Sequence, residues 1–177
     1  MRQAACLLAL VLGLAHPVVG WSQNKASESA KKPADGVYVV QRDSLKESDV
    51  LPLKKGEALL VHRHRYLKKD DKEPPRFVVV RSAPDVELDL AGEPTAVKEG
   101  TEVVRVLLKL QPKAATALER LTRDHVGGQI TIAVGGEVVT MHKIREVIRG
   151  GDVQITSCAA GAADYLFQQL QARQKKD

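Results

Sequence analysis

The chain has 177 residues, of which 44% are hydrophobic, 28% are charged and only 3% are aromatic. This length allows one globular domain or two small ones, with a core built mainly from aliphatic side chains. The formal net charge is +5, and charges of both signs are interspersed along the chain. That pattern favours a solvated mixed surface over a patch that binds nucleic acid or an anionic membrane.

The N-terminus carries the pattern of a cleaved export signal. Arg2 precedes an apolar run over residues 6–15, which is shorter than the ~20 residues that a membrane-spanning helix needs. We therefore expect a signal peptide over residues 1–20, followed by a flexible polar leader over residues 21–35. Since the rest of the chain has no apolar stretch of spanning length, we expect a periplasmic or secreted protein without an integral membrane span.

Residues 36–98 alternate short β-rich segments with proline, glycine and charge, which predicts a small β-rich N-terminal subdomain. The strands expected here are Val37 to Gln41, Ala58 to Leu67, Phe77 to Arg81 and Glu93 to Lys98.

A clearer periodicity begins after residue 99. Every second residue from Val104 to Leu110 is apolar, which predicts a strand with one buried face. Pro112 then suits the first turn of a helix, and Gly127-Gly128 supplies its stop. The apolar face of that helix consists of Ala114, Leu118, Leu121 and His125, at intervals that follow the 3.6-residue period.

A hairpin follows, because alternating residues 130–134 are separated from Val138-Val139 by Gly135-Gly136, and two-residue hairpin turns need positive φ. Extended segments are expected at residues 145–148 and 153–156, before a last helix over residues 160–174. Residues 99–174 thus predict a β-α-β-β-β-α domain of the α+β class, a mainly antiparallel sheet with two helices on one face. The apolar stripe of the last helix is expected to be Ala163, Leu166, Phe167 and Leu170.

The order of motifs in residues 101–172 resembles the periplasmic head subdomain of the SecD and SecDF family. In that family a helix ends in a threonine-containing turn, glycines lead into a hairpin, and an isoleucine-rich segment closes with Gly-x-x-Gln-Ile-Thr. The matching residues are Leu121, Thr122, Gly127, Gln129 to Val134, Gly135, Gly136, Glu137 to Val139, Ile144, Ile148, Gly151, Gln154, Ile155 and Thr156.

The resemblance implies an α+β fold and contact with polypeptide emerging during protein export. In the family, proton-coupled movement is driven by transmembrane helices, which this sequence lacks. The chain also departs from the family pattern, with Thr140-Met141-His142 where a small residue, Ala and Pro are usual. Gly135-Gly136 likewise replaces the usual acidic residue of the hairpin turn.

These observations predict an exported, non-enzymatic protein that binds unfolded polypeptide or an envelope protein, including components of the Sec translocase. The route would be an exposed strand edge or an apolar groove that accepts an extended chain. No cofactor, metal or catalytic residue is expected. The candidate contact residues are Gly135, Gly136, Glu137, Met141, His142 and Ile144.

Two alternatives remain open at this stage. The domain can dock on, or inhibit, one specific envelope protein. It can also be a secreted metal-dependent hydrolase, because His62 and His64 share a strand face and His125 and His142 are potential general bases. Cys158 is the only cysteine left after signal removal, so no internal disulfide can form, and we expect a buried thiol.

Overall fold

The computed structural model describes residues 33–63, 73–99, 103–157 and 160–174. These residues belong to one compact unit, which spans residues 32–177. The predictions for the signal peptide, most of the leader, His64 and Cys158 lie outside the described residues. The division into subdomains at residue 98 also stays a prediction.

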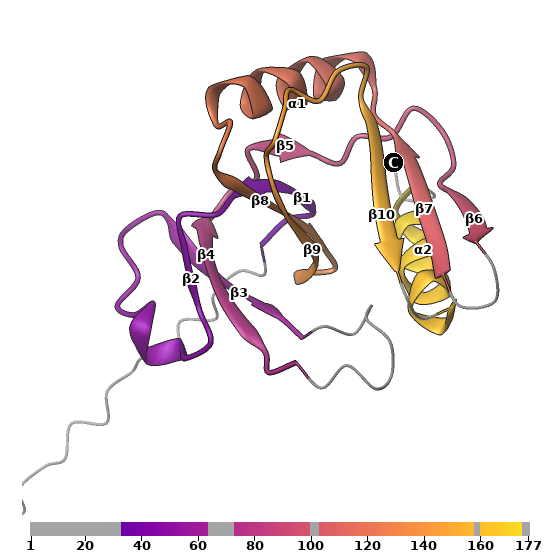
Figure 1. Ribbon diagram of the computed structural model, residues 1–177. Helices are drawn as coiled ribbons and strands as arrows, with labels where there is room; N and C mark the ends of the chain where they lie inside the picture. The colour runs from indigo at the N-terminus through magenta and orange to yellow at the C-terminus, as the bar shows by residue number, and fades with distance from the viewer. Residues whose placement is uncertain (1–32, 64–72, 100–102, 158–159, 175–177) are drawn as a thin grey trace, which may run out of the picture. The chain divides into compact units, whose positions relative to one another are not determined.

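The described part of the chain holds ten strands, two α-helices and one 3-10 helix (Figure 1). In chain order they are β1 (Gly36–Val39), β2 (Arg42–Ser44), η1 (Glu47–Asp49), β3 (Glu57–His62), β4 (Arg76–Arg81), β5 (Val86–Glu87), β6 (Thr95–Glu99), β7 (Val103–Lys109), α1 (Pro112–Asp124), β8 (Gln129–Val134), β9 (Glu137–Lys143), β10 (Asp152–Ser157) and α2 (Ala160–Gln174).

The strands form three antiparallel sheets, with the orders β5-β1-β8-β9, β10-β7-β6 and β2-β4-β3. The α+β class and the β-α-β-β-β-α order from β7 to α2 are therefore confirmed. The single sheet expected for residues 99–174 is not confirmed, because β7 and β10 pair in one sheet and the β8–β9 hairpin lies in another. Residues 145–148, expected to be extended, form no strand.

Strand β1 links the N-terminal segment to the hairpin. It pairs with β8 so that Val37 lies opposite Ile132 and Val39 opposite Ile130. Since side chains alternate along a strand, these valines enter the larger core, while Tyr38 between them enters a second core shared with β3 and β4. Both faces of this sheet are covered, which explains why β1 is buried throughout.

The two helices bury most of the stripes that their periodicity predicts, although His125 lies just after α1 and is only half-buried. In α1, Ala114, Leu118 and Leu121 are buried. In α2, which packs against β7, β8 and β10, the buried residues are Ala163, Leu166 and Leu170. Phe167 at the margin of the stripe is only half-buried. Both helices therefore contribute to the same large core that β1 and β7 line.

Candidate functional site

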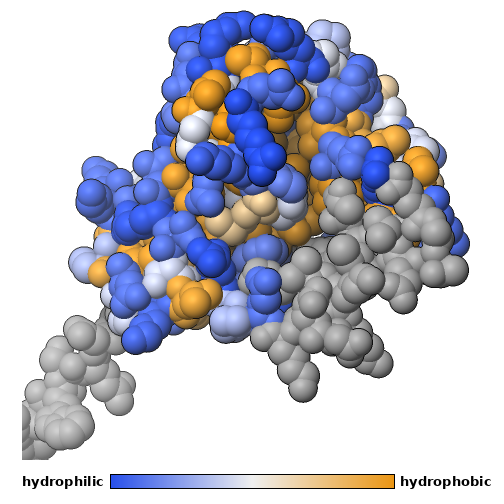
Figure 2. Space-filling model, viewed as in Figure 1, coloured by the Kyte–Doolittle hydropathy of each residue, from blue (hydrophilic) through white to orange (hydrophobic). Residues whose placement is uncertain are grey.

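An apolar groove of about 390 Å³ lies between the hairpin sheet, helix α1 and strand β10. Figure 2 shows hydrophobic surface, in orange, below α1 with hydrophilic side chains in front of it. Its apolar lining comes from five parts of the chain that are far apart in sequence. These lining side chains are Val37, Leu118, Ile130, Ile132, Ile144, Ile148 and Val153.

The segment after β9 forms one wall of the groove. Its start is fixed by two backbone bonds, in which Ile144 accepts the Gly127 N–H and donates to the Gly128 carbonyl, each at 2.9 Å. Its end is fixed at Gly151, where a Cβ would come within 2.5 Å of the Ala115 Cβ of α1. Glycine permits this close approach, and its φ of 74° is favourable only for glycine.

Thr122 holds the middle of that segment. Its hydroxyl is fully buried, donates to the Leu118 carbonyl at 2.9 Å, and accepts the N–H of Ile148 at 3.0 Å. A threonine in a helix often bonds back to the preceding turn, which leaves its oxygen lone pairs for a second partner. Thr122 therefore connects the helix to the groove wall through one oxygen atom.

The rim of the groove is polar and carries both signs of charge. Lys109 forms an ion pair with Asp152 at 2.8 Å on the β10 side. His142 remains exposed, and its Nε2 lies 2.8 Å from the Thr140 hydroxyl. Protein atoms around the ring still remove part of its hydration, and this desolvation lowers the pKa of the His142 imidazole. The remaining polar rim residues are Lys143, Arg145, Glu146 and Gln154.

The candidate contacts from sequence fall into separate places. His142 and Ile144 line the groove, although Ile144 is buried and presents only part of its surface there. Gly135, Gly136 and Glu137 lie at the hairpin turn, at the other end of β9. Glu137 is about 17 Å from His142 along the strand, at the usual rise per residue. Met141, the remaining candidate contact residue, packs against the second core.

The Gly135-Gly136 turn has the geometry that the sequence predicts, with φ values of 63° and 74°. Asp35 accepts the Gly135 N–H at 2.7 Å, and Glu137 lies 3.7 Å from Arg63. These contacts fix the hairpin tip to the segment before β1 and to the end of β3. A structural role thus accounts for the turn, and its role in binding stays a prediction.

Sequence reasoning missed most of the groove. Leu118, Ile130 and Ile132 were expected in the core, and the alternation that predicts their burial cannot tell a core wall from a groove floor. Val153 was placed on a strand without a role. The groove exists because β10 pairs with β7 and not with the hairpin, which leaves a space between β10 and the hairpin.

Two of the four histidines considered for catalysis, His62 and His125, lie outside the groove lining. His125 follows α1, and its Nδ1 lies 2.9 Å from the Leu121 carbonyl oxygen, as expected for a helix C-terminus. His62 ends β3, outside the groove lining. Within the described ranges, no three His, Cys, Asp or Glu residues are grouped so that they could hold a metal ion.

The fold and groove define an α+β domain with a cleft between two antiparallel sheets. The model of the family described as the SecDF P1 head subdomain matches residues 64–173, well over half of the chain. The chain therefore belongs to the SecDF P1 head subdomain family.

Two solved SecDF structures are also similar to the chain. One is of the membrane component SecDF that enhances protein export, at 28% identity and a TM-score of 0.42, covering 49% of this chain and 39% of that one. The other is SecDF in a super-membrane-facing form, at 28% identity and a TM-score of 0.40, covering 46% and 11%. The chain thus spans less than half of either protein. A search of curated proteins gives no significant match.

Neither α1 nor α2 is long and apolar enough to cross a membrane, within the residues that the structure describes.

Proposed function

We propose that this protein is an exported, non-enzymatic component of protein export that binds unfolded polypeptide in the groove beside β10. The observation that supports this proposal is an apolar groove of about 390 Å³ that adjoins the outer strand of a sheet. Membership of the SecDF P1 head family gives the export context. The groove volume is within the range of about 300–1,000 Å³ that is usual for ligand sites.

Strand β10 supplies the backbone part of the site. Its one strand neighbour among the described residues is β7, so it lies at an edge of its sheet. The Leu110 N–H donates to the Gly151 carbonyl, so the backbone groups of Gly151 point toward β7. Because backbone direction alternates along an antiparallel strand, the backbone groups of Val153 and Ile155 point toward β7 as well. The backbone groups of the alternate residues therefore point toward the position of an added strand.

The groove floor supplies the side-chain part. An extended chain beside β10 would direct every second side chain toward Ile130, Ile132 and Leu118, which accept apolar groups without directional bonds. The rim offers both acids and bases to the remaining side chains. Such a site selects extended apolar segments without reading an exact sequence, as contact with many unfolded polypeptides requires.

A matched pair of variants tests this proposal. Val153 is half-buried and lines the groove, whereas Val97 is exposed on β6 at the opposite edge of the same sheet. Val153→Asp places a charge in the apolar lining of the groove and should weaken binding of a fluorescent, permanently unfolded test polypeptide by at least about tenfold in anisotropy titrations. Val97→Asp should change the affinity less than about twofold.

Both variants are first checked for a native circular dichroism spectrum and cooperative unfolding. A folded Val153→Asp protein that binds like the wild type would show that the groove is not the site. If the wild-type protein binds no unfolded polypeptide, the proposed function itself is wrong. N-terminal sequencing of the protein recovered from the envelope fraction tests its export and signal cleavage.

A further inference from the structure

A second exposed feature lies outside the groove lining, on the loop of residues 45–56 between β2 and β3. Leu45, Leu51 and Leu53 are 51%, 45% and 37% exposed, so this loop carries three of the exposed large hydrophobic side chains of the described structure. In Figure 1 the loop lies at the margin of the drawing and includes the short helix η1. We call residues 45–56 the leucine loop.

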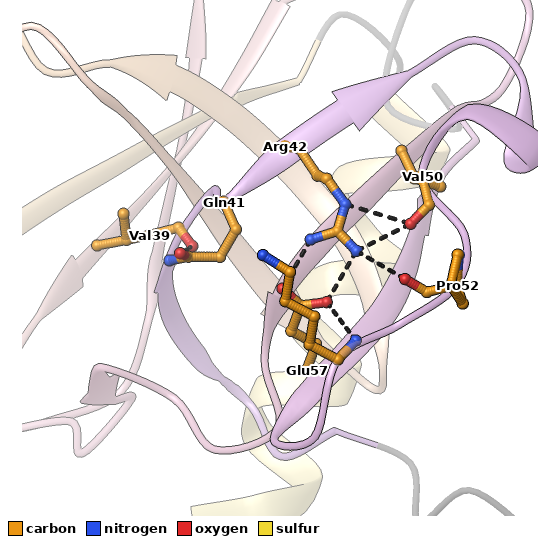
Figure 3. A network of polar contacts seen from close by, with 7 residues as sticks. Val39, Gln41, Arg42, Val50, Pro52 and Glu57 are labelled. Atoms are coloured by element: carbon orange, nitrogen blue, oxygen red, sulfur yellow. Dashed lines mark hydrogen bonds and ion pairs between the residues drawn. The ribbon is translucent and has the colours of Figure 1, made fainter.

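A polar network around Arg42 and Glu57 holds the backbone of this loop (Figure 3). The Arg42 guanidinium donates to the Val50 carbonyl at 2.9 Å and to the Pro52 carbonyl at 3.3 Å. It also binds both carboxylate oxygens of Glu57, at 2.6 and 2.8 Å. The backbone is thus fixed on each side of Leu51.

Two further contacts complete this support. Glu57 accepts the Lys54 N–H at 2.7 Å, just after Leu53. Val50 is buried and anchors the loop. These contacts fix the backbone around Leu51 and Leu53, so moving either residue toward the core would break a charged, bidentate pair, which is among the stronger hydrogen bonds in proteins.

Three exposed lysines flank the leucines. Lys46 follows Leu45 directly, and Lys54 and Lys55 follow Leu53. The two acids of the loop lie together on η1. Of these, Asp49 is bonded by the hydroxyls of Ser44 and Ser48 at 2.7 and 3.2 Å. Along the chain, lysines therefore follow Leu45 and Leu53 directly, while the two acids lie on η1 between Leu45 and Leu51.

We propose that the leucine loop docks on the surface of an anionic phospholipid bilayer. Leucines that enter the interface gain from burial among acyl chains, and neighbouring lysines meet lipid phosphates. The charge pattern favours this partner over an apolar protein surface, since lysine is depleted at protein interfaces. The loop precedes residue 64, where the family match begins, so the proposal does not depend on the groove or on the family.

The test uses a local probe, so that binding through the N-terminal segment does not affect the readout. In the full chain with Cys6 and Cys158 replaced by serine, Leu51→Cys is labelled with an environment-sensitive fluorophore, and Val97→Cys on β6 is the matched control. On vesicles of 30% anionic and 70% neutral phospholipid, the label at position 51 should shift to the blue and that at position 97 should not.

Two sets of variants separate the contribution of the leucines from that of the lysines. Combined Leu45→Ser and Leu53→Ser should weaken vesicle binding, read by the label at position 51, by at least about tenfold. Combined Lys54→Gln and Lys55→Gln should reduce binding to anionic vesicles about fivefold or more for each charge, with little effect on neutral vesicles.

An unshifted label at position 51 on every vesicle would overturn the proposal, and so would equal shifts at positions 51 and 97. Equal binding to neutral and anionic vesicles would remove the role of the lysines. If the label at position 51 instead responds to a purified envelope protein and not to lipid, the loop is a protein interface. Each variant is compared with its parent by circular dichroism, so that unfolding is recognised.

Discussion

Removing the Thr122 hydroxyl directly tests the contacts that hold the groove wall in place. Thr122→Val keeps the shape of the side chain and removes its one oxygen atom. The Ile148 N–H then loses its acceptor at 3.0 Å, while the Leu118 carbonyl loses only a second donor. Leaving a partly buried N–H without a partner costs about 1–3 kcal/mol.

Part of that cost is offset, because the added methyl group is buried in place of the hydroxyl. We expect the free energy of unfolding to fall by about 1–2 kcal/mol, which corresponds to about 2–8 °C in Tm for a chain of this size. Urea denaturation at 25 °C measures the first quantity directly. Amide hydrogen exchange at Ile148 should also accelerate, since the bond that protects it is absent.

Thr116 provides the control on the same helix. Its hydroxyl also donates to the carbonyl four residues earlier, at 2.9 Å, but it is exposed and no described residue is shown donating to it. Thr116→Val should therefore change stability by less than about 0.5 kcal/mol. Equal losses for the two variants would refute the argument, because the effect would then belong to the helix and not to the wall.

Two further predictions concern the loop network and the hairpin. The bidentate contact with Arg42 and the Lys54 N–H lower the pKa of Glu57 to about 2. The Glu57 carboxyl thus binds fewer protons in the native state than in the unfolded state. Its contribution to the stability of the fold is therefore complete above pH 4.5 and is lost as the pH falls toward 2. The Tm of Glu57→Gln should fall less than that of the wild type across that range. Gly135 has a φ of 63° and space for a methyl group, so Gly135→Ala should destabilise the protein by about 1 kcal/mol through backbone strain alone. Gly92→Ala, with open space and no positive φ, should be nearly neutral in the same urea titration, and equal effects of the two would contradict this reason.

The sequence by itself determines the local elements. Alternation predicts β7 and its buried residues, and Pro112 with Gly127 predicts the limits of α1 to within a few residues. The Gly135-Gly136 pair predicts a hairpin whose turn has positive φ at both glycines. These features depend on neighbours within a few positions, so a single sequence contains their cause.

Only the tertiary structure decides which strands pair. Gly36 and Ala133 lie opposite each other in one sheet although 97 positions separate them, and β10 joins β7 instead of the hairpin. A strand with period two fits many partners equally well, and the choice depends on how all buried faces are satisfied together. The groove and the exposure of the leucine loop follow from that choice. They could not be read from hydrophobicity, because buried and exposed leucines look the same in a sequence.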